Sequence, residues 1–579
     1  TWDIADGDIT VKAGEAEGPN KVKQGDSDFV KDEGDTIITG TSDKNTVTIE
    51  AENEGDKVEV TLKDVNIDAS SRSEAAVSVT GKGDTTIELD GDNELKSGAG
   101  HAGLEHNKTD TSGELTIQDK DNNGSLEAAG GFKGAGIGSA GSNDAQVKIT
   151  GGNITATSDD WGAGIGSGSY GTGTVEITGG EINATGGYLG AGIGGGCNGS
   201  GNVTISGGTI TAAGSDGAAG IGGGYYNGAT VTITGDAVIK NASSTKYGAG
   251  IGGGNGSDGN VTISGNAKIE NATGGYGAAG IGGGAFSSPD KIGNGNVVIK
   301  DNAKIDNVQG GAYGAGIGGG IYGLSNVTIE GNTKVNATGG AGGAAIGGGA
   351  GAENNSDNNG NQITIKSNEN GSPTINAVGG GTDEGKKIVI GGAGIGAGCE
   401  SNADADITLE GKVTITATAG KDNVAIGANG IEQEFSGLAE GSSITRYDPE
   451  GNDITLPTDP VPAVPSSSGG SSADASVQES VFPGLVVTDK DGQRISYTSI
   501  RGNNVLSLRV GRFTASLRAS LATLRQLRAE GIDTITFQTI LCSTTLSVDE
   551  LLAMGGEDAE VVLTHHIRSS TLTVNGKAV

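Results

Sequence analysis

Residues 190–196 read Gly-Ala-Gly-Ile-Gly-Gly-Gly, and two short strings follow them, Asn202-Val203-Thr204-Ile205-Ser206 and Thr209-Ile210-Thr211-Ala212. Apolar and polar residues alternate in both strings, and most of them are β-branched, which is typical of strands with one buried face. Gly or Asn bounds each string and indicates a turn. This segment therefore predicts three short strands joined by turns.

The Gly-rich string recurs ten times, as GAGIGGG or a close variant. Its Ile, or the equivalent Ile, lies at positions 137, 165, 193, 221, 251, 281, 317, 346, 395 and 426. Most spacings are close to 28–30 residues, and inserts such as the polar segment 350–361 lengthen the others. Self-similarity at this period predicts a solenoid, and three strands per repeat predict one rung of a parallel β-helix.

Equivalent residues of successive rungs should stack inside such a solenoid. The expected order is Val203 and Ile205, then Val231 and Ile233, then Val261 and Ile263, then Val327 and Ile329. The alternation also occurs upstream without the Gly-rich string, for example at 58–62 and 86–89. We therefore expect an N-terminal cap region over residues 1–35 and a parallel β-helix over residues 36–455.

The composition changes near residue 456. Residues 456–475 are rich in Pro, Ser and Gly, which predicts a semi-rigid linker. Residues 476–579 hold only 8 of the 112 Gly and 8 of the 10 Arg. For this region we expect a small α+β domain. Its predicted elements are a helix at about 514–530, a short helix from Ser547, and strands near 485–487, 505–510, 534–537 and 561–564.

Charge and cysteine content bound the partners. The chain has 37 basic and 71 acidic residues, a net charge of −34, which argues against nucleic acid because phosphate backbones would be repelled. No run of about 18 apolar residues occurs, so we expect no membrane insertion. Cys197, Cys399 and Cys542 lie far apart and show no spacing typical of a disulfide framework or a metal site.

Aromatic residues lie four or five positions from the central Ile of the Gly-rich strings. They are Phe132, Trp161, Tyr188, Tyr247, Tyr276 and Tyr313 before it, and Tyr170, Tyr225, Tyr226, Phe286 and Tyr322 after it. Stacked rungs would turn these residues into two rails that flank a floor of glycine. Aromatic faces suit stacking against sugar rings, so all of them except Phe132 are taken as candidate ligand-binding residues. A second interpretation stays open, in which the rings only cap the turns.

The sequence predicts no catalytic residues. Upstream of the linker the only histidines are His101 and His106, and the paired carboxylates Asp159 and Asp160 lie next to Trp161. Neighbours on a strand point to opposite faces, so this pair does not predict two carboxylates facing across a substrate. We expect a protein that is not an enzyme. A β-helix polysaccharide lyase or hydrolase, and a stalk that presents the C-terminal domain, remain alternatives.

Several segments carry a resemblance to a known group of proteins. They are VEVTLKDVNID at 58–68, residues 76–80 and 84–95, LTI at 115–117, SLEA at 125–128, and the repeated GAGIGGG with NVTISGGTITA. Together they resemble secreted Gram-positive carbohydrate-binding-domain proteins with a GAGIGGG-repeat right-handed parallel β-helix. The resemblance covers about residues 36–430.

The resemblance implies a right-handed parallel β-helix, secretion or display on a bacterial cell surface, and binding of a polysaccharide or host glycan without catalysis. It also implies calcium in some members, although the acidic residues here do not follow a G-G-x-G-x-D pattern. We therefore expect no cofactor and leave calcium open. The chain begins at Thr1 without a charged, apolar leader, which suits a mature secreted form or a shortened chain. The particular glycan, the anchoring and the oligomeric state are not predicted.

Overall fold

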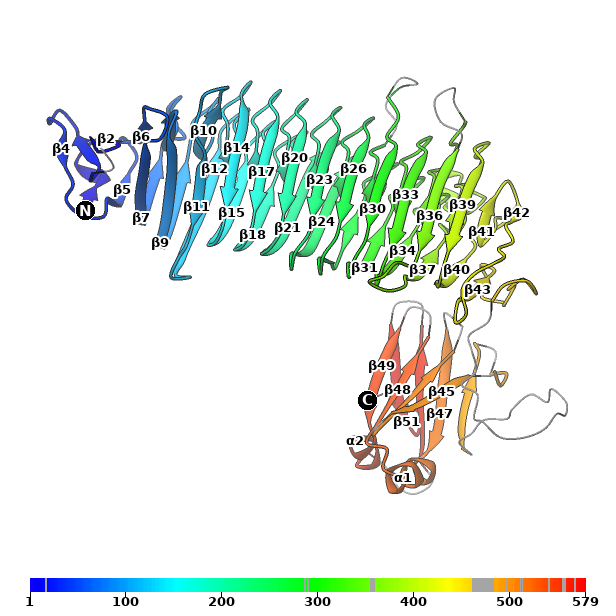
Figure 1. The fold of residues 1–579 in the computed structure, drawn as a ribbon. Helices are drawn as coiled ribbons and strands as arrows, with labels where there is room; N and C mark the ends of the chain where they lie inside the picture. The colour runs from blue at the N-terminus through cyan, green and yellow to red at the C-terminus, as the bar shows by residue number, and fades with distance from the viewer. Residues whose placement is uncertain are drawn as a thin grey trace. The chain divides into compact units, whose positions relative to one another are not determined.

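The computed structural model describes two ranges of the chain, shown in Figure 1. The first is residues 1–460 apart from 16–17, 286–287, 289–290 and 355–359. The second is residues 484–578 apart from 491, 496, 503, 511, 513, 540–541, 555–558 and 567–568. The chain forms two compact units, residues 1–449 with 453–463, and residues 450–452 with 464–579. Residues 461–475 of the predicted linker lie outside the described ranges.

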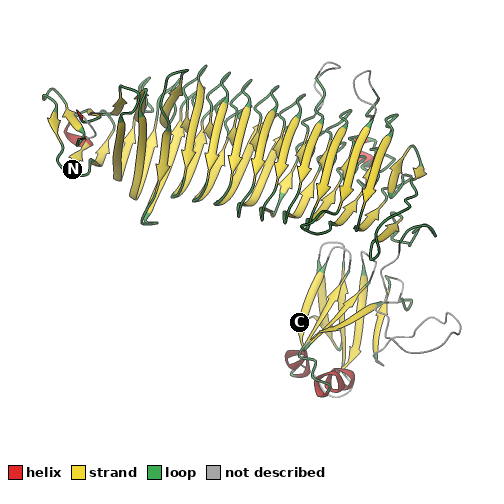
Figure 2. Cartoon of the chain, viewed as in Figure 1, coloured by secondary structure: helices red, strands yellow, loops and turns green. Residues whose placement is uncertain are grey.

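The first unit is a β-solenoid of about 15 turns. In Figure 1 its strands follow one another in chain order from blue to yellow, and nearly all of its elements in Figure 2 are strands. In the regular rungs, strands pair in parallel with the equivalent strand one turn later, for example Val175 with Val203 and Ile182 with Ile210. The prediction of an all-β parallel β-helix is confirmed.

Three strand faces make up the regular rungs. The first face contains β11 (Leu115–Gln118), β14 (Asp144–Ile149), β17 (Gly173–Ile177), β20 (Gly201–Ile205), β23 (Ala229–Ile233), β26 (Gly259–Ile263), β30 (Gly295–Ile299), β33 (Ser325–Glu330), β36 (Asn361–Lys366) and β39 (Ala405–Glu410). The second contains β12 (Gly124–Gly130), β15 (Asn153–Ser158), β18 (Glu181–Thr185), β21 (Thr209–Asp216), β24 (Val238–Lys246), β27 (Lys268–Ile269), β28 (Ala272–Thr273), β31 (Lys304–Gln309), β34 (Lys334–Thr338), β37 (Thr374–Val378), β40 (Thr414–Thr418) and β43 (Ser443–Tyr447).

The third face is formed by the Gly-rich strings. Its strands are β10 (Leu104–Lys108), β13 (Ile137–Gly138), β16 (Ile165–Gly166), β19 (Ile193–Gly194), β22 (Ile221–Gly222), β25 (Ile251–Gly252), β29 (Ile281–Gly282), β32 (Ile317–Gly318), β35 (Ile346–Gly347), β38 (Ile395–Gly396) and β41 (Ile426–Ala428). Gly194 has φ +130°, and a Cβ there would overlap the carbonyl oxygen of Gly222 in the next rung. Glycine is therefore required where successive strings stack.

The N-terminal rungs lack the Gly-rich string. They contain β5 (Ile37–Ser42), β6 (Val47–Ala51), β7 (Lys57–Asp68), β8 (Val77–Gly81) and β9 (Asp84–Lys96). Before them lie β1 (Trp2–Asp3), the short helix η1 (Ile4–Asp6), β2 (Ile9–Lys12), β3 (Lys21–Gln24) and β4 (Val30–Lys31). The strands β2, β3 and β4 pair antiparallel, and this pairing differs from the parallel stacking of the rungs that follow.

The core of the solenoid is a ladder of like residues. Ile193 pairs with Ile221, which pairs with Ile251, and all three side chains are buried. The predicted order of the Val and Ile ladder needs one correction, because Val297 and Ile299 of β30 lie between the pairs at 261–263 and 327–329. The pairs at 261–263 and 327–329 are therefore two rungs apart.

The last rung is covered by the segment that follows it. Arg446 on β43 is fully buried, and its guanidinium donates to both carboxylate oxygens of Asp459 at 2.7 and 2.8 Å. It also donates to Glu432 on β42 (Ile431–Glu432) and to the carbonyl oxygen of Gln433. Residues 456–459, where the sequence predicts the start of the linker, thus pack on the solenoid. We call the contacts of Arg446 with Asp459 and Glu432 the C-terminal clasp.

The second unit contains two sheets and two helices. One sheet has β44 (Leu485–Thr488), β47 (Ala515–Ser520), β50 (Glu560–His565), β51 (Ser570–Val574) and β52 (Lys577–Ala578). The other has β45 (Thr498–Gly502), β46 (Val505–Arg509), β48 (Thr534–Gln538) and β49 (Ser543–Ser547). The helices are α1 (Leu521–Ala529) and α2 (Val548–Leu552), and a short helix η3 (Glu384–Lys386) belongs to the first unit.

The predicted helix over 514–530 is wrong in its first half. Residues 515–520 form β47, in which Ala515, Leu517 and Ala519 are buried. The Ser520 hydroxyl accepts a hydrogen bond from the backbone N–H of Thr523 at 3.1 Å and starts α1. Leu517 and Leu521 have helical spacing, but the alternation of the preceding residues also fits a strand, and pairing with β50 decides between them.

Candidate functional site

Each Gly-rich string forms a narrow loop whose two arms lie side by side. In one rung the N–H of Ala191 donates to the carbonyl oxygen of Gly195 at 2.9 Å, and in the next rung Ala219 donates to Gly223 at 2.9 Å. The Ile between the arms points into the core. Residues four or five positions before the Ile are thereby brought next to residues four or five positions after it.

Backbone hydrogen bonds join these two rows of residues directly. Cys197 donates to the carbonyl oxygen of Trp161 at 2.7 Å, Ala285 donates to Tyr247 at 2.7 Å, and Ala350 donates to Tyr313 at 2.8 Å. The predicted arrangement of two rails separated by a floor of glycine is therefore wrong. The loop reverses the chain so tightly that the rows touch, and the glycines lie buried beneath them.

The joined rows form one edge of the solenoid, which we call the aromatic edge. It consists of Phe132, Trp161, Tyr170, Tyr188, Tyr225, Tyr226, Tyr247, Tyr276, Tyr313 and Tyr322. Seven of these side chains are at least 36% exposed, from 36% for Tyr226 to 57% for Tyr170. Trp161, Tyr225 and Tyr313 are partly buried. Phe286, also a candidate ligand-binding residue, lies outside the described residues.

Six residues of the aromatic edge have a left-handed backbone conformation. Their φ values are +64° for Trp161, +65° for Tyr170, +63° for Tyr226, +46° for Tyr247, +72° for Tyr313 and +61° for Tyr322. This conformation costs a residue with a side chain roughly 1–2 kcal/mol. Equivalent positions in other rungs hold Gly217, Gly256, Gly277, Gly342 and Gly351, also with positive φ. The turn therefore does not need a ring.

The rings of adjacent rungs contact one another. The centroids of Tyr247 and Tyr276 are 6.1 Å apart, and those of Tyr276 and Tyr313 are 5.6 Å apart, with both pairs edge to face. Phe132 and Trp161 form a tilted pair at 5.3 Å. The Lys133 ammonium lies 5.2 Å from each of these two ring centroids. Neighbouring rungs thus combine their rings into continuous apolar surfaces.

Tyr225 and Tyr226 form a third group of rings. Their centroids are 3.8 Å apart, and the Tyr225 hydroxyl donates to the Tyr226 hydroxyl at 2.7 Å. Burial, followed by the contact with Tyr226, raises the pKa of Tyr225 to about 12, so the phenol stays a hydrogen-bond donor at neutral pH. The Lys291 ammonium lies 4.3 Å from the Tyr226 centroid.

Three buried polar atoms without partners belong to residues next to the rings. The Oδ1 atom of Asp160, the Oγ atom of Ser169 and the Oδ1 atom of Asn255 are buried and form no hydrogen bond in the structure. Burial, then the charge of Asp159, raises the pKa of Asp160. Burial, then Asp160, raises the pKa of the Cys197 thiol to about 11. That thiol is therefore protonated, and not a nucleophile, at neutral pH.

One rung of the third face was missed in the sequence. Leu104 on β10 pairs with Ile137, so the string from Gly98 to Leu104 is another copy in which Leu replaces Ile. Glu105 stands where later copies have glycine, and its carboxylate accepts from His101 Nδ1 at 2.8 Å and from the backbone N–H of Ala102 at 3.0 Å. Leu104 precedes Ile137 by 33 residues, close to the repeat length, and this spacing could have identified the extra copy in the sequence.

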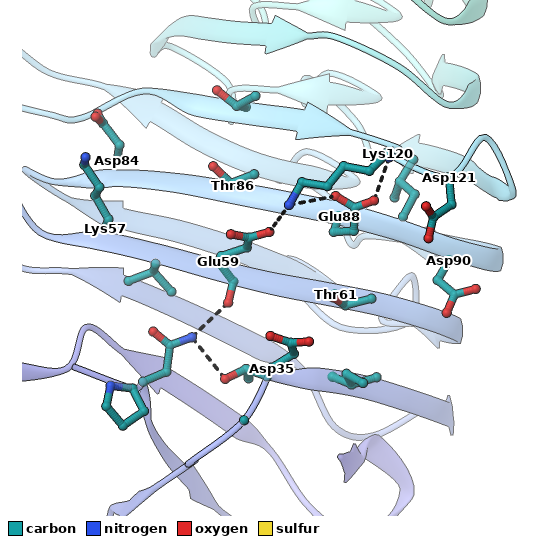
Figure 3. A pocket seen from close by; sticks show the side chains of 18 of the residues that line it. Asp35, Lys57, Glu59, Thr61, Asp84, Thr86, Glu88, Asp90, Lys120 and Asp121 are labelled. Carbon is teal, nitrogen blue, oxygen red and sulfur yellow. Dashed lines mark hydrogen bonds and ion pairs between the residues drawn. The ribbon is translucent and has the colours of Figure 1, made fainter. Parts of the chain in front are cut away.

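A polar groove of about 890 Å³ lies over the N-terminal rungs, at β5, β7, β9 and β11 (Figure 3). Its carboxylates are Asp35, Glu59, Asp84, Glu88, Asp90, Glu114 and Asp121. The Lys120 ammonium donates to Glu59 at 2.6 Å and lies 3.7 Å from Glu88. Sequence analysis missed this groove because its residues come from rungs without the Gly-rich string.

Two carboxylates of the groove, Glu59 and Glu88, are paired with the Lys120 ammonium. The hydrogen bond with Glu59 raises the pKa of Lys120, which therefore stays protonated and is a poor general base at neutral pH. Among the described residues, those of the groove included, no group of three or more His, Cys, Asp or Glu side chains is arranged to hold a metal ion. Within the described ranges, the structure also contains no helix of the length and hydropathy needed to span a membrane.

No curated protein and no solved structure matches the chain. A family model described as "Beta helix repeat" matches residues 147–169, 175–197, 203–225 and 261–285. Each match begins at an inward-facing Val of the first face and ends four residues after the Ile of a Gly-rich string. The rungs of this chain are therefore similar to the Beta helix repeat family, in agreement with the parallel β-helix seen in the structure.

Proposed function

We propose that this protein binds a glycan along the aromatic edge and acts without catalysis, as a secreted or cell-surface glycan-binding or adhesive protein. The observation that carries the proposal is the set of rings at left-handed backbone positions. The same turns are built with glycine elsewhere in the solenoid. Strained residues at solvent-facing positions favour a functional role, because nothing in the fold requires them.

The chemistry of the aromatic edge fits a sugar chain. Tyr and Trp rings present apolar faces for stacking on sugar rings, and tyrosine hydroxyls add hydrogen bonds. Rings such as Tyr247, Tyr276 and Tyr313 come from successive rungs, which repeat about every 4.8 Å. A surface fixed by the parallel ladder loses little conformational entropy on binding. An extended ligand lying along the solenoid would meet one ring group after another.

A polysaccharide lyase or hydrolase is the catalytic alternative, and the N-terminal groove is the feature that favours it. The ion pairs of Lys120 with Glu59 and Glu88 argue for a structural role of these carboxylates. The Glu59→Gln and Glu88→Gln variants test this alternative. Polysaccharide cleavage by the parent protein that both substitutions abolish would establish the enzyme and contradict the non-catalytic proposal.

The proposal is tested by glycan-array binding of the full chain, with calcium and with a chelator. The matched variant is the triple substitution Tyr170→Gly, Tyr247→Gly and Tyr322→Gly, which places glycine where the fold already accepts it. Phe29→Ala is the control, because Phe29 is 41% exposed and lies in the N-terminal region away from the aromatic edge. We expect the triple variant to lose binding while the control keeps it. Absence of binding to every glycan would leave the stalk as the better account.

A further inference from the structure

Two lysines next to the aromatic edge, Lys133 and Lys291, lie over aromatic rings and form no ion pair with a carboxylate among the described residues. Lys133 contacts the faces of Phe132 and Trp161, and Lys291 contacts the face of Tyr226. Neither lysine has an ion-pair partner within 4.0 Å among the described residues. Lys246, which lies next to Tyr247, is by contrast paired with Asp216 at 2.7 Å.

Two buried polar atoms without a hydrogen-bond partner lie close to Lys133 and to the Tyr225–Tyr226 pair. Ser169 is fully buried, its backbone N–H donates to the carbonyl oxygen of Lys133 at 3.0 Å, and its Oγ atom forms no hydrogen bond. Asn255 is 6% exposed, and its Oδ1 atom is likewise without a partner. The Asn255 side chain is hydrogen-bonded to the Tyr225 hydroxyl, and the Tyr225 ring is tilted against that of Tyr226. Rings and a lysine without a carboxylate partner therefore occur together at two places, and each place also has a buried side-chain oxygen that forms no hydrogen bond.

We propose that these two places are subsites for acidic sugars, which carry an exocyclic carboxylate or sulfate. This inference rests on the proposed function and names the ligand class. The sugar ring packs against Trp161 or Tyr226 beside the lysine, and its anionic group pairs with the ammonium of Lys133 or Lys291. An ammonium held over rings, without a carboxylate beside it, keeps its charge available for a ligand.

The net charge of −34 does not oppose this specificity at short range. Charges separated by more than about 8 Å in solvent are largely screened at physiological ionic strength. The carboxylates closest in sequence are Asp159 and Asp160 to Trp161, Glu127 to Lys133 and Asp290 to Lys291, and the Oδ1 atom of Asp160 is buried. The electrostatic interaction of a ligand anion therefore depends mainly on the lysine that it contacts and only weakly on the rest of the solenoid.

The test compares one oligosaccharide in two charge states on the full chain. Hexagalacturonate and its methyl ester have the same sugar backbone, and the ester removes the negative charges. Binding is measured by calorimetry in EDTA, which prevents calcium from bridging carboxylates. We expect hexagalacturonate to bind about tenfold more tightly than the ester. The variants Lys133→Gln and Lys291→Gln should each reduce that ratio, because they remove the charge and keep a side chain of similar length.

The control variant is Lys334→Gln. Lys334 is exposed on β34, away from the aromatic edge, and should leave the binding of both oligosaccharides unchanged. Equal affinity of the parent protein for the two oligosaccharides would overturn the inference and leave the proposed function standing. If the parent protein binds neither oligosaccharide, and no neutral glycan on the array binds it, the proposed function itself is overturned.

A sulfated galactan oligosaccharide of the same length, without carboxylates, distinguishes the two sources of charge. Tight binding that also depends on Lys133 and Lys291 would assign recognition to charge alone. Preference for hexagalacturonate over the sulfated oligosaccharide would assign it to the carboxylate. If Lys334→Gln lowers the affinity for either anion as much as Lys133→Gln does, the attraction is diffuse and the subsites are refuted.

Discussion

The turns that carry the aromatic edge and the turns of the last rungs have the same backbone and different side chains. The loop bond from Ala191 to Gly195 recurs downstream from Ala344 to Gly348 and from Ala393 to Ala397. Where the edge has Trp or Tyr with positive φ, the later rungs have Gly342, Gly351, Glu400 and Asp422. The comparison shows that the turn requires a left-handed residue and that the ring is an addition to it.

The largest loss of stability should come from substituting glycines that occupy equivalent positions in the aromatic-edge rungs and in the last rungs. Gly194→Ala and Gly396→Ala place a Cβ against the carbonyl oxygen of the next rung, at φ +130° and +138°. Each should destabilise the solenoid by more than about 3 kcal/mol, seen as a large drop in the melting temperature. An unchanged melting temperature for either variant would refute the shared steric role.

The second prediction separates the two regions. Tyr170→Gly and Tyr322→Gly should each weaken glycan binding about tenfold or more, and change the free energy of unfolding by no more than about 1 kcal/mol. Relief of the left-handed strain offsets the lost ring contacts and the greater flexibility of the unfolded chain. Denaturant unfolding and binding titrations measure the two quantities. A large loss of stability with intact binding would make the rings structural caps.

The third prediction concerns the reactivity of the thiols Cys197 and Cys399, which should be equally low in the two regions. Burial raises the pKa of Cys399 to about 11, as it does for Cys197. At pH 7.5 both thiols in the folded protein should therefore react with iodoacetamide on the order of 100-fold more slowly than in urea. Peptide mapping of the alkylated protein measures both rates. Rapid labelling of Cys197 alone would show that the aromatic edge opens in solution.

The smallest effect is expected at Asp160. Its pKa is raised in the folded state, so the folded protein holds this proton more tightly than the unfolded chain does. The carboxyl group therefore lowers stability as pH rises through that raised pKa, and the penalty is complete at neutral pH. Asp160→Asn should give a small increase in melting temperature at pH 7 and less at pH 3. An equal change in melting temperature at pH 7 and pH 3 would show that titration of Asp160 does not contribute to stability.

The sequence predicted the fold because identical residues recur at fixed spacing. Val203 and Val231 stack because they are equivalent positions of one repeat, and that equivalence is readable in the sequence. The offsets also identified Trp161 and Tyr247 as members of one surface. They could not show that the two aromatic rows touch, because the reversal depends on backbone angles and on hydrogen bonds between rungs.

The remaining features depend on contacts that the repeat does not encode. Lys120 reaches Glu59 across 61 positions of sequence, in rungs whose lengths vary. The position of β47 is set by pairing with β50, since the spacing from Leu517 to the leucines of α1 fits a helix equally well. In both cases side chains or strands from distant segments decide between local alternatives of similar energy.

The C-terminal clasp sets the point at which the solenoid can be cut. During synthesis each rung has a template in the rung before it, so the solenoid can assemble from its N-terminus. Arg446 of the last rung is buried, and its main counter-ion, Asp459, is made 13 residues later. A fragment that ends before Asp459 would leave that cation only with Glu432, in a rung whose edge is open. The shortest stable version of this unit therefore extends through the residues that contact Arg446, beyond the last strand of the ladder.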